Sequence, residues 1–202
     1  MPESGTTRSR LLESARELFT TTGYHSTTTP MLAKRAGVAE GTIYRHFPSK
    51  QALLNAAYQE TQRWGTATVR EVSTGTGRTV GARLTALGRV WLEQGEKEPA
   101  RVRMLLGWKL TSELDELSRS AASELRQGLE HLIARGKQEG SVRAGVVELW
   151  TAVWLTLVAF AAERVANREW TANHPHAVAT LDAAWEAIAW RPIAVGGSTA
   201  GS

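Results

Sequence analysis

The sequence contains no cysteine, which excludes a disulfide framework and any metal site built on thiolates. It also lacks the short motifs on which several enzyme classes depend: the HExxH pair of zinc hydrolases, the phosphate-binding P-loop and the GxSxG nucleophile turn. No spacing typical of metal ligands is found among its five histidines, which are His25, His46, His131, His174 and His176. The sequence therefore argues against an enzyme, and we expect no catalytic residue, no metal and no cofactor.

Long hydrophobic runs are also missing. The longest, LWTAVWLTLVAFAA, lies between Glu148 and Glu163 and has 14 residues, whereas a membrane-spanning helix needs about 20. The first ten residues, MPESGTTRSR, contain no apolar segment of the kind found in secretory signals. We expect a buried helix at the apolar run, no membrane association and a cytoplasmic location.

Charge is unevenly distributed along the chain. Residues 1–63 contain eight Lys and Arg against five Asp and Glu, a net charge of +3, out of +4 for all 202 residues. A basic end joined to a nearly neutral body suits a nucleic-acid-binding part attached to another function.

Apolar residues recur every three to four positions along most of the chain, as expected for helices, and no segment alternates like a half-buried strand. Glycine, proline and capping residues divide the pattern into about nine helices. The expected helices cover about 7–22, 29–36, 39–46, 50–72, 79–94, 100–113, 115–138, 144–168 and 175–190. The predicted fold is all-α, with a small N-terminal domain at 7–50, a larger helical domain at 51–191 and a flexible tail at 192–202.

The segment 27–50 combines two short helices, a tight glycine-containing turn and the start of a longer helix. This arrangement is typical of a helix-turn-helix, whose second helix enters the major groove of DNA. Helical spacing places Ile43 and Phe47 toward the core and Tyr44 on the opposite side. Gly41 costs about 1 kcal/mol inside a helix, and a close approach to DNA would explain it.

Several side chains of this segment suit contacts with DNA. Hydroxyl, imidazole and ammonium groups can donate to phosphates, whereas Arg45 offers guanine a two-pronged contact. Glu40 can accept from cytosine, although an exposed glutamate on a helix needs no such role. The predicted DNA-binding residues are Thr28, Thr29, Glu40, Gly41, Thr42, Tyr44, Arg45, His46 and Lys50.

The run GYHSTTTPMLAKRAGVAEGTIYRHFPSKQALL resembles the signature of TetR/AcrR-type transcriptional regulators. It contains the glycine-aromatic pair, the threonine pair, Ala-Gly-Val and Gly-Thr-x-Tyr-x-His-Phe in register, and the resemblance covers about residues 8–58. The family often has serine where this chain has Ala39. The recognition helix therefore lacks a side-chain cap, which is typically worth about 1 kcal/mol.

The resemblance implies a homodimer that binds a double-stranded DNA operator. It makes the three-helix domain at 7–50 the DNA-binding domain and the helical domain at 51–191 the regulatory and dimerisation domain. Members of this family dimerise through their last two long helices. Here the helix at 144–168 is apolar nearly all round, and the last helix has a 3-4-3 apolar spacing suited to a partner helix. The expected dimer contacts are Trp154, Leu157, Ala161, Val178, Leu181, Trp185 and Ile188.

Eight tryptophans are present, and most of them lie in the C-terminal part. By analogy with the family, some of them surround a small-molecule cavity, although each could equally fill the core. The expected ligand-binding residues are Trp64, Trp91, Trp108, Trp150 and Trp154. The helix that starts at Lys50 is the expected coupling element between ligand and DNA.

The sequence thus predicts a homodimeric repressor that releases a (pseudo)palindromic operator when a small hydrophobic or aromatic effector binds. Two alternatives remain open: a helix-turn-helix regulator without small-molecule control, and an activator of transcription.

Overall fold

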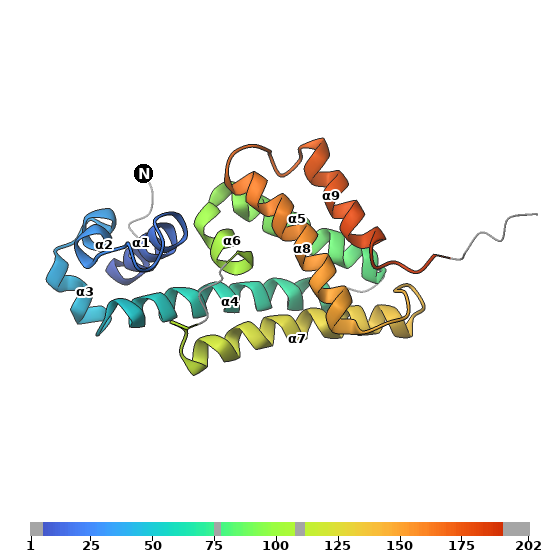
Figure 1. Ribbon diagram of the computed structural model, residues 1–202, viewed down its shortest axis with the longest axis horizontal. Helices are drawn as coiled ribbons and strands as arrows, with labels where there is room; N and C mark the ends of the chain where they lie inside the picture. Colours follow the sequence, from blue (N-terminus) through green and yellow to red (C-terminus); the bar gives the residue numbers. More distant parts are fainter. Residues whose placement is uncertain (1–5, 75–77, 108–111, 192–202) are drawn as a thin grey trace, which may run out of the picture.

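The computed structural model of the protein describes residues 6–74, 78–107 and 112–191 (Figure 1). Within these residues the chain forms nine α-helices, and its only β pairing is an isolated antiparallel bridge between Val142 and Ala189. The helices are α1 (Thr7–Thr21), α2 (Thr29–Ala36), α3 (Glu40–His46), α4 (Lys50–Thr74), α5 (Val80–Lys97), α6 (Pro99–Leu106), α7 (Glu116–Gln138), α8 (Val147–Ala166) and α9 (Pro175–Glu186). The prediction of an all-α fold is confirmed.

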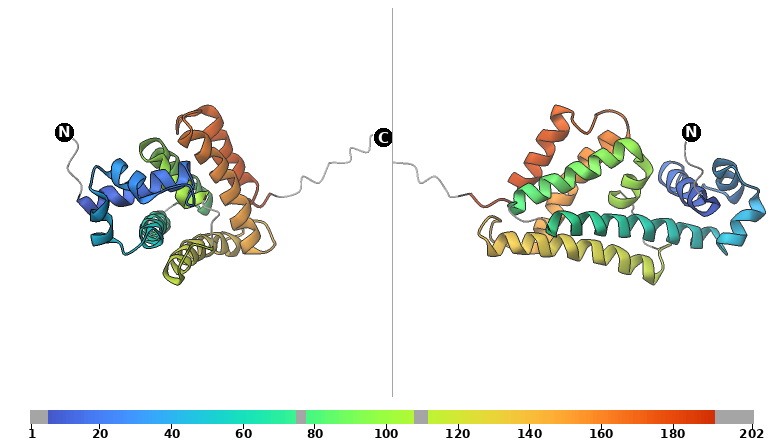
Figure 2. Two further views of the ribbon diagram at one scale, coloured as in Figure 1. Left: turned by 60° about the vertical axis from the view of Figure 1, so that its left-hand side comes forward. Right: turned by 180° about the vertical axis from the view of Figure 1, so that it is seen from behind.

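Helices α1, α2 and α3 form a cluster at one end of the molecule, and α4 runs from this cluster along the body (Figure 1). Helix α7 lies against α4, while α8 crosses the body and packs on α9. The short helix α6 contacts α1, α4, α5 and α8, so it lies between the N-terminal cluster and the rest of the protein (Figure 2).

Local capping sets the ends of the N-terminal helices. The Thr28 hydroxyl accepts from the backbone N–H of Met31 at the start of α2, and Gly37 ends this helix in the left-handed conformation, at φ +64°. The Ser49 hydroxyl accepts from the N–H of Ala52 and begins α4. The expected absence of a cap at Ala39 is confirmed, because no side-chain hydrogen bond closes the start of α3.

Two groups of buried side chains make up the core. The first joins α1, α2 and α3 to the first half of α4, as far as Tyr58, and also takes in Met104 and Leu114. The second joins α5, α7, α8 and α9 around Trp91 and Trp154. Helix α4 contributes to both groups, so it is the common element of the two halves.

Several helix ends differ from the predictions. Helix α6 ends at Leu106 instead of 113, and Ser112 and Glu113 lie in a turn. Helix α8 begins at Val147 because the chain turns at Gly145, where φ is +129°, a conformation that strongly favours glycine. Helix α9 ends at Glu186, four residues early, and the chain then pairs with Val142 at the bridge. The predicted tail at 192–202 lies outside the described residues.

Candidate DNA-binding site

Helix α3 is held by one face and presents the other to solvent. Ile43 is fully buried and Phe47 is 4% exposed, and both pack in the N-terminal core. Tyr44 is 52% exposed, and Arg45 and His46 beside it are also exposed. The predicted division of this helix into an inner and an outer face is therefore confirmed.

Gly41 lies on the exposed part of α3. A Cβ atom placed on it would meet no protein atom within 4 Å, so packing inside the protein does not require glycine at this position. The residue therefore leaves the first turn of α3 open to a molecule outside the protein.

Glu40 has a structural partner that the sequence pattern did not indicate. The Thr29 hydroxyl donates to its carboxylate at an Oγ1–Oε1 distance of 2.9 Å, which joins the start of α2 to the start of α3. The neighbouring Thr28 caps α2, and Thr42 is half-buried. Thr29 and Glu40 are thus placed to orient the two helices with respect to one another.

The structure gives Lys50 a different role from the predicted phosphate contact. Its ammonium donates to the backbone carbonyls of Tyr24 and Thr27, both at 2.9 Å, and lies 4.3 Å from the centre of the Tyr24 ring. Through these contacts the ammonium group of Lys50 holds the start of α4 against the loop between α1 and α2. A lysine held in this way is a poor candidate for contacting a phosphate.

Two arginines of α1 that the sequence analysis did not select lie beside this site. The guanidinium of Arg8 lies 5.3 Å from the centre of the Phe47 ring at the end of α3, and Arg10 lies 3.7 Å from the Cβ position of Gly37 in the turn after α2. Both arginines are exposed. The excess of basic residues in the first third of the sequence was the signal that could have identified them.

The predicted tryptophan site is not assembled. Trp91 and Trp154 are 0% and 1% exposed and pack on each other at 5.9 Å between ring centres, and the Trp91 N–H donates to Thr68. Trp64 and Trp150 are half-buried and lie under Arg101 and Arg143, respectively. Trp108 lies outside the described residues. Trp91 and Trp154 are therefore core residues, and their indoles are not free to line a pocket.

A cavity of about 260 Å³ lies instead between α4, α6, α7 and α8. Its lining residues are Tyr58, Gln62, Leu105, Leu106, Ala122, Leu125, Arg126, Leu129 and Leu155. None of these residues is among the ligand-binding residues expected from the sequence.

The predicted dimer residues also need correction. Four of them are buried within the chain's own core, with exposed fractions of 3% or less: Trp154, Ala161, Leu181 and Ile188. Trp185 is half-buried and packs so closely on Gly81 that a Cβ atom there would lie 2.5 Å from its ring. Only Leu157 and Val178 of the remaining residues keep partly exposed side chains with no such constraint. The apolar seam of α9 therefore faces inward.

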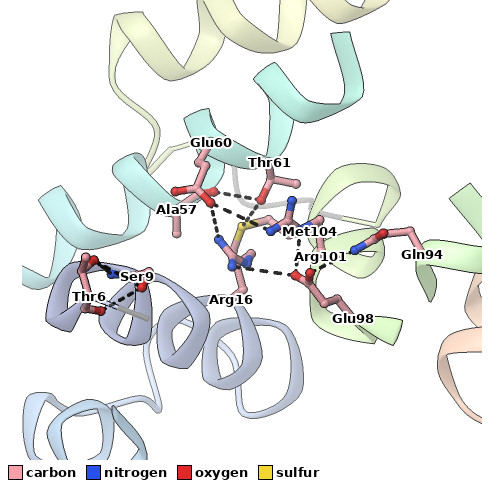
Figure 3. Close-up of polar contacts among 10 residues, drawn as sticks. All are labelled: Thr6, Ser9, Arg16, Ala57, Glu60, Thr61, Gln94, Glu98, Arg101 and Met104. Carbon is pink, nitrogen blue, oxygen red and sulfur yellow. Dashed lines mark hydrogen bonds and ion pairs between the residues drawn. The ribbon is translucent and has the colours of Figure 1, made fainter. Parts of the chain in front are cut away.

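An ionic network connects the N-terminal cluster to the body (Figure 3). Arg16 of α1 is 5% exposed and donates to Glu60 of α4 at 3.2 Å, and it lies 3.9 Å from Glu98 at the start of α6. Arg101 of α6 pairs with Glu98 at 2.8 Å and lies 4.0 Å from Glu60. Burial and the charge of Arg101 lower the pKa of Arg16, and the two carboxylates act in the opposite direction.

Comparison with known proteins agrees with this geometry. Residues 11–57 match the family described as "Bacterial regulatory proteins, tetR family". The HTH-type transcriptional regulator UidR of Escherichia coli (strain K12) is 39% identical over 69 residues, which are 34% of this chain and 35% of UidR. The chain thus spans about a third of the length of this relative.

A longer match is to the nucleoid occlusion factor SlmA of Marinobacter nauticus, 32% identical over 139 residues, which are 69% of this chain and 70% of SlmA. The crystal structure of a TetR family transcription regulator from Marinobacter aquaeolei VT8 has the same fold, with a TM-score of 0.76 at 20% identity, covering 92% of this chain and 96% of that one. With the exposed recognition helix α3, these matches establish that the chain belongs to the TetR family of DNA-binding transcription regulators.

Proposed function

We propose that this regulator is a cytoplasmic homodimeric repressor that releases a (pseudo)palindromic operator when a small hydrophobic molecule binds its C-terminal part. The observation that carries the proposal is the course of α4. This 25-residue helix is tied to the N-terminal cluster by Lys50 at its first residue, and it lines the cavity with Tyr58 and Gln62 two and three turns later. A ligand in the cavity therefore contacts the helix that carries the recognition elements.

DNA recognition is assigned to the exposed face of α3. Arg45 is the candidate for reading guanine, because a guanidinium can contact both acceptors on the major-groove edge of that base. The candidates for contacts to phosphate are Tyr44, His46, Thr28 and Thr42, joined by Arg8 and Arg10 of α1. Thr29 is left out because its hydroxyl donates to Glu40. The open space around Gly41 supports a close approach of DNA to the first turn of the helix.

Dimerisation is assigned to the outward face of α8, in place of the seam expected from the sequence. Helix α8 is apolar along most of its length, yet less than half of it is buried in a single chain. Leu149 and Phe160 are 53% and 46% exposed, and Ala152 and Thr156 between them are also exposed. Their spacing of three to four residues forms one stripe, as a helix needs in order to pack on a second copy.

Coupling between ligand and DNA is assigned to α4 and α6 together. A ligand shifts an equilibrium only through a difference in affinity between two states. The cavity lies against both helices, and the ionic network of Arg16, Glu60, Glu98 and Arg101 joins the same helices to α1. A state that better accommodates the ligand would therefore change the position of the N-terminal cluster.

Selection of genomic DNA fragments by the purified protein tests this proposal. We expect a recovered motif with two related half-sites spaced by about one helical turn, as two recognition helices of a symmetric dimer require. Recovery of fragments with no common motif would contradict sequence-specific regulation. A single half-site bound by a monomer in sedimentation analysis would contradict the dimer and leave DNA recognition standing.

A further inference from the structure

The cavity between α4, α6, α7 and α8 has an uneven chemical lining. Six of its nine lining side chains are apolar: Leu105, Leu106, Ala122, Leu125, Leu129 and Leu155. The polar ones are Tyr58 and Gln62 from α4 and Arg126 from α7, and no acidic side chain is found among the described residues that line the cavity. Such a lining suits a mostly apolar molecule with one polar end.

Gln62 is buried, and its side chain has no hydrogen-bond partner among the described residues. It is 2% exposed, and within the described part of the chain its amide makes no hydrogen bond. In the described part of the chain, two side-chain atoms are both fully enclosed and without a hydrogen bond, Thr66 Oγ1 and Trp150 Nε1. The amide of Gln62 is not among them, so it keeps contact with open space. Because Gln62 lines the cavity, the open space that its amide touches is the cavity itself. Native proteins rarely leave such a group unpaired without a function.

Tyr58 lies one turn before Gln62 on the same face of α4, and it is 7% exposed. No side chain or backbone group in the described ranges pairs with its hydroxyl. Burial raises the pKa of Tyr58 and the positive charge of Arg126 opposes this, so the phenol is protonated at neutral pH and available as a donor.

Arg126 is the positively charged residue among the described residues that line the cavity. It is exposed at the edge of the cavity and forms no ion pair with any described residue, whereas Arg135, nine residues later on α7, pairs with Glu139 at 3.0 Å. An unpaired guanidinium at the mouth of an apolar cavity favours an anion and disfavours a cation.

We infer that this cavity binds a small apolar carboxylic acid as its anion, with the carboxylate between Arg126, Tyr58 and Gln62 and the hydrocarbon part against the leucines. The inference rests on the proposed ligand-responsive function and adds the chemical class of the effector. The cavity volume of about 260 Å³ lies just below the range typical of sites for drug-sized molecules. The effector is therefore expected to be a small molecule.

Calorimetric titration of the full-length protein without DNA tests the inference, with octanoate, 1-octanol and octylamine as probes. We expect octanoate to bind at one site per chain, about tenfold or more tightly than 1-octanol, because a charge-assisted hydrogen bond is lost with the carboxylate. Octylamine should bind more weakly than either. Equal binding of octanoate and 1-octanol, or no binding of octanoate, would overturn the inference.

Three variants locate the site. Arg126→Gln should weaken octanoate about tenfold and change 1-octanol by less than about twofold, because only the charged contact is removed. Arg135→Gln is the matched control, since it removes an exposed arginine of the same helix outside this cavity, and it should leave octanoate affinity unchanged. Gln62→Met should weaken octanoate while raising the melting temperature of the free protein, because an unpaired buried amide is removed. Equal effects of Arg126→Gln and Arg135→Gln would refute the placement.

Operator binding is measured separately, so that the two proposals can fail independently. If octanoate binds with the expected variant pattern but does not change the affinity for the operator, the proposal that a ligand controls DNA binding is refuted. The ligand chemistry inferred for the cavity then stands. If octanoate does not bind and a palindromic operator is still selected, the effector class is refuted and sequence-specific regulation stands.

Discussion

Replacement of Arg16 by methionine tests how strongly the N-terminal cluster is joined to the body. The side chain of Arg16 is 7% exposed and lies between two carboxylates, with Glu60 at 3.2 Å and Glu98 at 3.9 Å. Methionine keeps most of the apolar stem and removes the charge and its hydrogen bond. The variant therefore isolates the ionic contribution from that of packing.

The expected loss can be worked out from the burial of the partners. Removing one member of a fully buried ion pair costs about 3–5 kcal/mol, because the other member stays buried and unpaired. Here the side chains of Glu60 and Glu98 are 42% and 41% exposed, so water compensates for part of the loss, and both keep Arg101 as a neighbour. We therefore expect Arg16→Met to lower the free energy of unfolding by about 2 kcal/mol, which is about 4–8 °C in melting temperature.

The assay is urea unfolding at neutral pH followed by tryptophan fluorescence and circular dichroism. Arg63→Met is the control, because Arg63 lies on the same helix as Glu60 but is exposed, and among the described residues its side chain bonds only to Gln59. Its effect should stay within about 0.5 kcal/mol. A change of less than about 0.5 kcal/mol for Arg16→Met as well would refute the reasoning, since the network would then contribute no more than a surface pair.

Four further substitutions address the other assignments. Arg45→Ala should reduce binding of the selected operator by about 1–3 kcal/mol with the loss concentrated at particular base pairs, measured on single-position operator variants, and equal losses at all positions would contradict base reading. Lys50→Met should lower the free energy of unfolding by about 1–3 kcal/mol, because two partly buried carbonyls lose their hydrogen-bond donor. An unchanged melting curve would contradict the structural role given to this lysine. Asp115→Ala should cost about 1 kcal/mol, because this carboxylate caps α7 through the N–H of Ser118. Partial burial raises the pKa of Asp115, but hydrogen bonds from Ser118 and Gln59 lower it more, so the stabilisation is complete above its ordinary pKa of 3.8 and is lost as the pH falls below it; acid titration of stability in the variant should lack this loss. Phe160→Glu should convert the dimer to monomer in analytical ultracentrifugation, and a dimer that survives the change would place the interface elsewhere.

The N-terminal part could be predicted because its signals are local. A capping threonine, a proline in the first turn and a left-handed glycine define α2 within ten residues, and their effects do not depend on distant parts of the chain. The inner face of α3 follows from helical spacing alone, since one stripe of a short helix must be apolar to pack. The helices of this part accordingly begin and end within one residue of the predicted positions.

The role of Lys50 could not be predicted because its partners are 23 and 26 residues away. A lysine at the start of a helix beside a recognition element fits a phosphate contact equally well from the sequence. Only the loop at Tyr24 and Thr27, which places two carbonyls next to the ammonium, distinguishes the two. The same loop supplies the aromatic ring over which the charge lies.

The seam predicted on α9 differs from the packing of the single chain for another physical reason. Helix α8 is apolar on nearly every side, so its pattern does not indicate which side meets the chain's own core. Helix α9 has a clear stripe, but a stripe shows only that a helix packs on something. The structure places Leu181 and Ile188 of that stripe in the core and leaves Leu149 and Phe160 of α8 outside.

The positions of the cavity and the ionic network on α4 explain how one helix can serve both. With 3.6 residues per turn, Glu60 points about 200° around the helix from Tyr58, while Gln62 returns to the side of Tyr58. The two sites therefore occupy opposite faces of the same turns. On α6 the two sites lie on the same face, one turn apart. Arg101 pairs with Glu98, and Leu105, four residues later, lines the cavity.

A ligand that presses on Leu105 must displace α6 or deform it, and an eight-residue helix moves more easily than it bends. Because α6 carries Arg101, and Glu98 directly precedes its first residue, any displacement of α6 changes the distances from these two side chains to Glu60 and Arg16. Arg16→Met should therefore weaken the effect of a bound carboxylate on operator affinity as well as the stability of the protein. Retention of the full effect in this variant would show that the signal passes along α4 alone.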